Sequence, residues 1–394
     1  MDLELTGEQA AVRELAAGFT DREIVPFAAG WDRAESIDPG IVKKLGELGF
    51  LGLTVPEEYG GSGGDHLAYC LVLEELGRGD SSVRGVVSVS LGLVGKSINA
   101  FGTEEQKRQW LPRLCSGEAL ACFALTEPGT GSDAANLTTR AVRDAGGTTR
   151  LSAAKSGGDW LISGAKMFIT NGTWAEVALV FARTGEPGHR GVSAFLVPTD
   201  SPGFTRTLIH GKLGLRGQAT AELHLDAVRV PDSARLGEEG KGFTVAMAAL
   251  AKGRMSVAAG CVGIAQASLD AAVRYAGERE QFGKSIAHHQ LVQELLADIA
   301  VDVAAARMLT WRVADLIDRR LPFATESSVA KLFASEAAVR CANNALQVFG
   351  GYGFTDEYPV GKYLRDARVM TLYEGTSQIH KLLIGRSLTG VNAF

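Results

Sequence analysis

The chain has 394 residues, more than one hydrophobic core usually supports, so two or three domains are expected. Its composition, 46% hydrophobic and 22% charged, is ordinary for a soluble globular protein, and a formal net charge of -5 provides no general attraction to nucleic acid. The acidic start MDLELTGE lacks the pattern of a signal peptide, and no run of about 18 apolar residues is uninterrupted. The five cysteines occur singly, which indicates neither a disulfide framework nor a thiolate metal site. We expect a cytoplasmic protein with no membrane span, nucleic-acid partner or metal.

The first 120 residues have the pattern of a helical domain. Thr6 and Gln9 form a candidate capping box, and apolar residues follow at helical spacing as far as Pro26. A charged helix is predicted from Thr103 onward, and the character of the chain changes after Gly117. Residues 1–120 are therefore expected to form an N-terminal helical domain.

Residues 121–232 are expected to form a central β domain. Short β-rich runs alternate with turn residues, a pattern typical of antiparallel strands. Examples are the runs that begin at Trp160, Lys166, Val177 and Val192. Residues 135–158 are rich in turn residues and are predicted to be a solvated insertion between strands, and Pro231 closes the region.

Helical periodicity returns at about Gly242 and continues to the end of the chain. From Leu291 to Ile317, apolar residues recur at helical spacing without an internal glycine or proline. So long an amphipathic helix usually packs in a bundle, and its surplus apolar surface often serves subunit contact. Residues 233–394 are therefore expected to form a helical bundle domain.

Five segments could carry chemistry, and the first is CFALTEPGTGSD at residues 122–133. It has the pattern of a strand that runs into a glycine-containing loop. Thr126 and Ser132 can hydrogen-bond to ring heteroatoms or phosphate oxygens, and the glycines let the backbone approach a ligand. Taken alone, the segment is equally consistent with a hairpin turn. It is not a G-x-G-x-x-G motif that opens a helix, so a Rossmann unit is not indicated.

The second and third segments also have two interpretations each. In KMFITNG, Phe168 and Thr170 could lie against a planar ligand, although a plain strand and turn would have the same pattern. In REQFG, a cation, an amide and an aromatic ring follow the end of a helix at Arg279, Gln281 and Phe282. A charge at a helix C-terminus explains Arg279 without any ligand.

The fourth segment, QVFGGYGF at residues 347–354, ends a helix with three glycines within four residues. A simple C-cap needs only one glycine. Several glycines in succession normally mean that another backbone or a flat ligand lies close.

The fifth segment, LYEGTSQI, places the lone carboxylate of Glu374 between an aromatic ring and a glycine. A carboxylate withdrawn from water has a raised pKa, which suits a general base for a weakly acidic C–H. The alternative for a lone glutamate is a solvated surface residue.

These five segments, in this order and spacing, resemble the acyl-CoA dehydrogenase family over nearly the whole chain. The resemblance implies a mostly α fold with a central β domain: an N-terminal helical domain, a β-barrel-like middle domain and a C-terminal four-helix bundle, usually assembled as a homotetramer. It also implies an FAD enzyme of fatty acid or amino acid catabolism. Its substrate would be a short-chain acyl-CoA or an acyl-carrier-protein thioester, and an electron-transfer flavoprotein would accept the electrons.

Motif by motif, the resemblance assigns residues to the cofactor and the substrate. The residues matched to FAD contacts are Phe123, Leu125, Thr126, Ser132, Phe168, Thr170, Arg279, Gln281, Phe282, Gln347, Gly351, Thr376 and Gln378. Those matched to substrate contacts are Ser132, Arg254, Tyr373 and Gly375. Positions that reach the FAD of a neighbouring subunit are matched by Arg279, Gln281 and Phe282, and positions that meet its adenosine end are matched by Gln347 and Gly351. The chain departs from the family pattern at two positions. Phe168 replaces a common tryptophan. Ala251 replaces a common aspartate, and this second departure leaves open whether coenzyme A or a carrier protein carries the thioester.

In the mechanism that the resemblance implies, Glu374 removes the pro-R α-proton while hydride passes from the β-carbon to flavin N5, giving a trans-2-enoyl thioester. Hydrogen bonds from the backbone N–H of the base and from the flavin ribityl hydroxyl would stabilise the developing enolate. The alternatives are a flavin oxidase or hydroxylase on the same scaffold, and a non-catalytic relative. Both would be expected to alter Glu374 or the flavin loops, which this chain retains.

The segment SSVRGVVSVS, which contains Arg84, resembles the corresponding stretch of glutaryl-CoA dehydrogenases, as does the chain end from residue 379 to 394. In those enzymes an arginine binds the distal carboxylate of the substrate, so Arg84 is a further candidate for substrate binding. From the sequence, a surface or capping role for Arg84 is the favoured interpretation.

Overall fold

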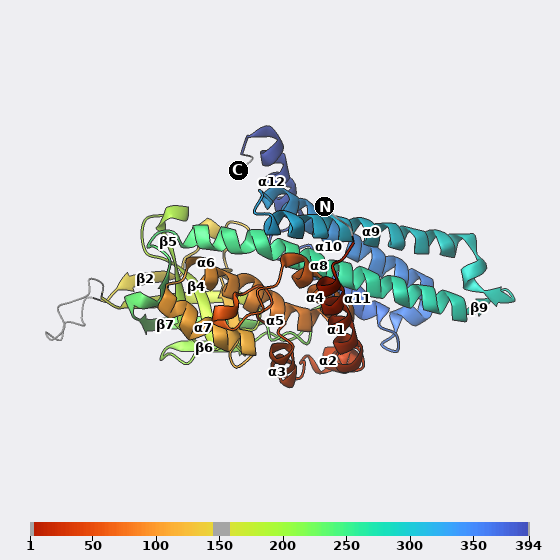
Figure 1. The fold of residues 1–394 in the computed structure, drawn as a ribbon, viewed down its shortest axis with the longest axis horizontal. Coiled ribbons are helices and arrows are strands. Elements are labelled where there is room, and N and C mark those ends of the chain that lie inside the picture. The colour runs from red at the N-terminus through yellow and green to blue at the C-terminus, as the bar shows by residue number, and fades with distance from the viewer. Residues whose placement is uncertain (1–3, 145–157, 393–394) are drawn as a thin grey trace.

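The computed structural model describes residues 4–144 and 158–392, in which a helical part, a sheet and a second helical part follow one another along the chain (Figure 1). The N-terminal helices are α1 (Gly7–Glu23), α2 (Ala28–Ala34), α3 (Gly40–Glu47), α4 (His66–Gly79), α5 (Ser81–Val89), α6 (Lys96–Phe101) and α7 (Glu104–Ser116). The capping box predicted at Thr6 and Gln9 is confirmed, and Thr103 caps α7 in the same way. One π-helical segment, Ser90–Gly95, joins α5 to α6.

An eight-stranded sheet forms the middle of the chain. Its strands are β1 (Ala121–Ala124), β2 (Arg140–Arg143), β3 (Trp160–Ile169), β4 (Val177–Arg183), β5 (Val192–Pro198), β6 (Phe204–Leu208), β7 (Ala221–Val230) and β8 (Arg235–Leu236). The strand order is β6-β7-β3-β2-β4-β5-β8, and β1 pairs in parallel with β4. β4 and β5 are buried along nearly their whole length, which explains their continuous apolar runs.

Three local predictions for this region need correction. The runs predicted at Trp160 and Lys166 form one strand, β3, whose pairing with β7 shifts register beside Gly164. The predicted insertion is not all loop: it contains β2, whose residues pair with those of β3. Strand β8 follows Pro231, which therefore does not close the sheet. Residues 145–157, the remainder of the predicted insertion, lie outside the described residues.

The C-terminal part contains the long helices α8 (Gly242–Glu278), α9 (Gln290–Asp318) and α10 (Ala324–Phe349), followed by α11 (Val360–Met370) and α12 (Ser377–Thr389). The short strands β9 (Glu280–Gln281) and β10 (Lys284–Ser285) form a hairpin between α8 and α9. The long helix predicted over 291–317 is confirmed as α9. In Figure 1 this hairpin lies at one end of the long axis and the β domain at the other.

Helix α8 packs against α4, α9 and α10 and is the centre of this bundle. It is long and apolar enough to cross a membrane, but 78% of its most apolar window is buried inside the protein. Backbones approach closely along it: a Cβ on Gly77 of α4 would lie 2.8 Å from the carbonyl oxygen of Gly260 of α8. The apolar character of α8 therefore belongs to a core helix.

Candidate active site

Glu374 lies in the turn between α11 and α12, with a backbone φ of 50°, and Gly375 follows with a φ of 100°. The carboxylate rests against α8, where a side chain on Gly253 would collide with Glu374 Oε2. The residue as a whole is half-buried, but its Oε2 atom is inaccessible and has no hydrogen-bond partner among the described residues. The solvated-surface interpretation of Glu374 is therefore wrong.

The electrostatic surroundings of Glu374 combine burial with cations. Burial raises the pKa of the Glu374 carboxyl to about 7. The cations that oppose this rise are Arg84, Lys331 and Arg254. A carboxyl that titrates near neutral pH can both take and release a proton under ordinary conditions.

Arg84 lies inside the molecule, with 1% of its surface exposed. Its Nη2 donates to Tyr373 Oη at 2.6 Å, and its guanidinium packs on Gly260, where a Cβ would lie 2.7 Å from Nε. That Nε has no hydrogen-bond partner among the described residues. The surface or capping role favoured from the sequence is therefore wrong, because the helix that carries Arg84 is buried along its whole length.

A small apolar cluster adjoins the carboxylate. Val89, Leu93 and Ala249 form this cluster, with Phe123 of β1 packed against it. Leu93 and Glu374 flank the same glycine, since a Cβ on Gly253 would also lie 2.7 Å from Leu93 Cδ2. This group, the Leu93 cluster, places apolar side chains of α5, of the π-helical segment and of α8 next to the carboxylate, with strand β1 alongside.

The two segments predicted to hold the flavin are joined to each other. Met167 N–H donates to the carbonyl of Thr126 at 2.9 Å, and Lys166 Nζ donates to the carbonyl of Leu125 at 3.2 Å. The loop itself closes through paired hydrogen bonds between Glu127 and Thr130. The segment thus contains the tight turn of the alternative interpretation, and this turn lies beside β3, while the ligand contacts remain a prediction.

The ligand-facing surface of these segments is open. Phe168 has a φ of 60° and is 66% exposed, an uncommon state for an aromatic residue beside a buried strand. Ser132 is exposed, and nothing lies within 4 Å of a Cβ built on Gly129 or Gly131. An outward-facing ring beside an unobstructed glycine loop fits a planar, phosphate-bearing cofactor.

At the far end of the bundle, Arg279, Gln281 and Gly351 line a groove of about 450 Å³. Stacked rings of Tyr275 and Phe349, 4.0 Å apart, form part of its floor. Phe282 is 92% exposed and Gln347 is exposed, and neither lines the groove. In Figure 1 this hairpin end is far from the β domain, so one chain does not bring the two sets of predicted FAD contacts together.

The other predicted residues have mixed surroundings. Arg254 Nη1 lies 3.3 Å from Ser328 Oγ, its Nε lacks a partner among the described residues, and burial lowers its pKa. Thr376 caps α12 by accepting from Ile379 N–H at 3.2 Å, and Gln378 is exposed. A structural role therefore accounts for Thr376 without a ligand.

Several residues of the site were missed from the sequence. They are Gly253 and the Leu93 cluster, the buried Lys331 and His380, and the buried pair Glu127 and Lys166. The available signal for Lys331 was a single long, charged side chain on a helix face of otherwise small residues, since α10 buries Ser327, Ser328, Ala334 and Ser335 around it.

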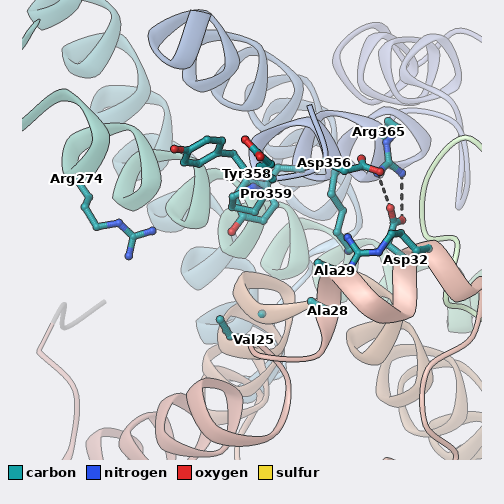
Figure 2. A pocket seen from close by; sticks show the side chains of 14 residues that line it. Val25, Ala28, Ala29, Asp32, Arg274, Asp356, Tyr358, Pro359 and Arg365 are labelled. Carbon is teal, nitrogen blue, oxygen red and sulfur yellow. Dashed lines mark hydrogen bonds and ion pairs between the residues drawn. The ribbon is translucent and has the colours of Figure 1, made fainter. Parts of the chain in front are cut away.

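A separate cavity of about 270 Å³ lies between α2, α8 and α11 (Figure 2). Asp32 and Arg365 form an ion pair at its edge, at 2.5 Å, and Arg274 extends from the opposite side. None of the predicted site residues lines it. In the described part of the chain, no group of three or more His, Cys, Asp or Glu side chains could hold a metal ion.

Comparison with known families gives consecutive matches along the chain. Residues 6–118 match the acyl-CoA dehydrogenase N-terminal domain, 122–228 the middle domain and 240–389 the C-terminal domain. The chain belongs to the acyl-CoA dehydrogenase family. The family, its three-domain fold and the class of enzyme expected from the sequence are thereby confirmed.

Individual relatives extend over the same length. The chain is 45% identical over 392 residues to a probable acyl-CoA dehydrogenase, YngJ, of Bacillus subtilis, covering 98% of this chain and 100% of the relative. It is 42% identical over 387 residues to the mitochondrial short-chain specific acyl-CoA dehydrogenase of Rattus norvegicus, covering 98% and 91%.

Among solved structures, butyryl-CoA dehydrogenase from Megasphaera elsdenii has a TM-score of 0.94 at 38% identity, covering 98% of this chain and 100% of that one. A glutaryl-CoA dehydrogenase from Mycobacterium smegmatis in complex with FADH2 has a TM-score of 0.92 at 37% identity, covering 99% and 96%. A chain in the structure of the electron transferring flavoprotein of Acidaminococcus fermentans has a TM-score of 0.93 at 39% identity, covering 99% and 100%. The family uses FAD, so the protein is an FAD-dependent oxidoreductase.

Proposed function

We propose that this member of the family dehydrogenates a short-chain acyl-CoA and that Glu374 is the base that removes the α-proton. One observation carries the proposal: a carboxylate oxygen that has no hydrogen-bond partner in the described part of the chain lies beside the apolar Leu93 cluster. FAD, when bound, supplies the acceptor for the hydride that leaves the β-carbon. The similarity to short-chain and butyryl-CoA dehydrogenases supports the short acyl chain.

The residues around Glu374 have distinct parts in the proposed reaction. The carboxylate accepts the α-proton, and a pKa near 7 leaves much of it ionised at neutral pH. The Glu374 N–H donates to no backbone acceptor among the described residues, so it is free to donate to the thioester carbonyl, where negative charge develops. The Leu93 cluster excludes water from the acyl chain.

The test is anaerobic reduction of the purified flavoprotein by a panel of acyl-CoA thioesters. Butyryl-CoA is expected to bleach the visible absorbance of the flavin, and the product is expected to be the trans-2-enoyl-CoA. Octanoyl-CoA and a carrier-protein thioester test chain length and carrier. Rapid reoxidation by oxygen alone would favour the oxidase alternative, and the absence of bleaching by every thioester would contradict the proposal.

A dicarboxylic substrate is the second candidate, because Arg84 is buried beside Tyr373 and its Nε has no hydrogen-bond partner in residues 4–144 and 158–392. A buried guanidinium can bind a carboxylate through two parallel hydrogen bonds. The similarity to glutaryl-CoA dehydrogenases supports this candidate. It requires a higher kcat/KM for glutaryl-CoA than for butyryl-CoA, and loss of that preference in Arg84→Ala. Equal or better activity on butyryl-CoA or isobutyryl-CoA would eliminate it.

We further propose that the protein is a homotetramer in which the FAD site is shared between subunits. The groove at the hairpin end would receive the adenosine end of a partner's FAD, since it is lined by Arg279, Gln281 and Gly351. The exposed side chains of Phe282 and Leu291 near this end would then be covered. An electron-transfer flavoprotein is the proposed electron acceptor.

A further inference from the structure

The turn that carries Glu374 is fastened to helix α10 at two points. Lys331 Nζ donates to the carbonyl of Gly375 at 2.7 Å. Ser377 Oγ donates to Glu336 Oε1 at 2.5 Å. Because these contacts lie on either side of Thr376, α10 holds the whole segment between the base and the start of α12.

Lys331 is a wholly buried lysine, with 0% of its surface exposed. The carbonyl of Gly375 is its one hydrogen-bond acceptor among the described residues. Removing an ammonium from water is strongly unfavourable, and an apolar side chain of similar volume would fill the same space without that penalty. Filling the core therefore does not explain a lysine at this position.

The backbone that Lys331 holds is one that needs to be held. Glu374 has a φ of 50°, a region that residues other than glycine rarely adopt, and such conformations persist only where the surroundings impose them. On the opposite side of the turn, a Cβ on Gly375 would lie 3.0 Å from His380 Nε2. The turn is thus confined between α10 and α12.

We infer that Lys331 is a positioning residue for proton abstraction: its ammonium holds the Gly375 carbonyl and thereby directs the Glu374 carboxylate over Gly253, toward the α-carbon of the substrate. The inference rests on the proposed role of Glu374 as the base.

The charge of Lys331 has a second effect. A nearby cation stabilises the ionised carboxylate, so Lys331 opposes the rise that burial imposes on the Glu374 pKa. Burial in turn lowers the pKa of Lys331 to about 8. The other groups that act on these two residues are Arg84 of α5, Arg254 and Cys261 of α8, and Glu336 of α10, while His380 of α12 lies against Gly375. These groups are unchanged in the variants below.

The test separates proton abstraction from oxidation by using acetyl-CoA. Acetyl-CoA has α-hydrogens but no β-carbon, so it cannot be dehydrogenated. In deuterated buffer the base removes an α-proton and the carbanion takes up a deuteron, which mass spectrometry measures. The FAD-loaded protein, Glu374→Gln, Lys331→Met and Lys331→Arg are compared across pH. Lys252→Met is the matched control, since burial also lowers the pKa of this half-buried lysine of α8.

In Lys331→Met, the exchange rate is expected to fall by on the order of 10²-fold, because the base is misplaced. The pH at which the exchange rate rises is expected to be higher by about one pH unit, because the cation that favours the ionised carboxylate is lost. Lys331→Arg should keep the position of that rise, and Lys252→Met should match the unmodified protein. If Lys331→Met does not fold, Lys331→Gln, a neutral donor, must show the same upward movement.

Unchanged exchange rates and an unchanged pH dependence in Lys331→Met or Lys331→Gln would overturn the inference about Lys331 and leave the assignment of Glu374 as the base intact. Exchange by Glu374→Gln at the unmodified rate would overturn the assignment of the base, and the inference with it.

Discussion

The Glu127 carboxylate lies 2.9 Å from the Lys166 ammonium inside the β domain, with 2% and 0% of the two side chains exposed. Lys166 also donates to the carbonyl of Phe181, and Glu127 accepts from the backbone N–H of Thr139 at 2.9 Å. The pair therefore joins the glycine loop to β3, the strand that carries Phe168.

Replacing Glu127 by glutamine should destabilise the protein by about 3–5 kcal/mol, because it leaves a buried ammonium without a charged partner. Urea unfolding measures this change. The matched control is Glu118→Gln, since Glu118 pairs with Arg113 at 2.8 Å but is 65% exposed. Its expected change is about 0–1 kcal/mol. Similar losses in the two variants would show that burial of the Glu127 pair has no special weight.

The same carboxylate should contribute to acid sensitivity. Although burial raises the pKa of Glu127, the Lys166 cation and the hydrogen bonds from Thr138 and Thr139 outweigh it and hold the pKa at about 2, below the usual 4.5. A lowered folded-state pKa provides stability that is complete above the unfolded-state pKa and disappears as pH falls toward 2. Between pH 5 and 3, the unmodified protein should therefore lose more unfolding free energy than Glu127→Gln. Parallel losses in urea titrations would exclude this contribution.

Glu374→Gln is expected to retain FAD and to lower turnover by orders of magnitude, because the change removes the base and preserves shape. In the unmodified protein, kcat/KM should rise with pH through about 7, since the carboxyl must be ionised to accept the proton. Steady-state rates with butyryl-CoA check both statements. Near-normal turnover by Glu374→Gln would remove it as the base.

Gly253→Ala should lower turnover without preventing folding, because a methyl group there collides with the Glu374 carboxylate. The control is Gly277→Ala in the same helix, where nothing lies within 4 Å of the added Cβ. Alanine normally stabilises a helix interior by about 0.5–1 kcal/mol relative to glycine, but the Cβ on residue 253 would also lie 2.7 Å from Leu93 Cδ2, so little net change in the stability of Gly253→Ala is expected. Gly253→Ala should therefore keep its melting temperature while its kcat falls, and Gly277→Ala should keep both its melting temperature and its kcat. Full activity of Gly253→Ala would show that the carboxylate is not confined against α8.

FAD retention is expected to depend on assembly, because β9, beside the groove that Arg279 and Gln281 line, lies at the opposite end of the molecule from the β domain (Figure 1). Dilution or substitution that produces monomers should release the flavin, as measured by absorbance after size-exclusion chromatography. Arg279→Ala should lower FAD content, whereas Arg274→Ala, in the last turns of α8 and outside this groove, should not. A monomer with one tightly bound FAD would contradict the shared site.

Local signals predicted the helices and the motif-bearing turns well. The capping box at Thr6 and the apolar spacing of α9 depend on residues close in sequence, so the pattern alone reveals them. The YEGT segment likewise made Glu374 the candidate base without knowledge of its neighbours, and that role remains a prediction. The boundaries at residues 120 and 232 remain predictions.

The missed features depend on contacts between distant segments. β2 is a short strand whose identity comes from pairing with β3, and its own sequence resembles a turn region. Arg84 lies in a helix whose burial is set by α8 and the Glu374 turn, so its own segment gave no sign that Tyr373 was its partner. Lys331 likewise meets Gly375 only after the bundle has folded.

The separation of the glycine loop from the hairpin groove has a genetic consequence. If a chain supplies its own base but depends on a partner's groove, a mutant lacking Glu374 and a mutant lacking Arg279 carry defects in different halves of the shared site. In a mixed assembly, the base of the second chain would meet the intact groove of the first. Two alleles that are each inactive would then restore part of the activity when expressed in the same cell.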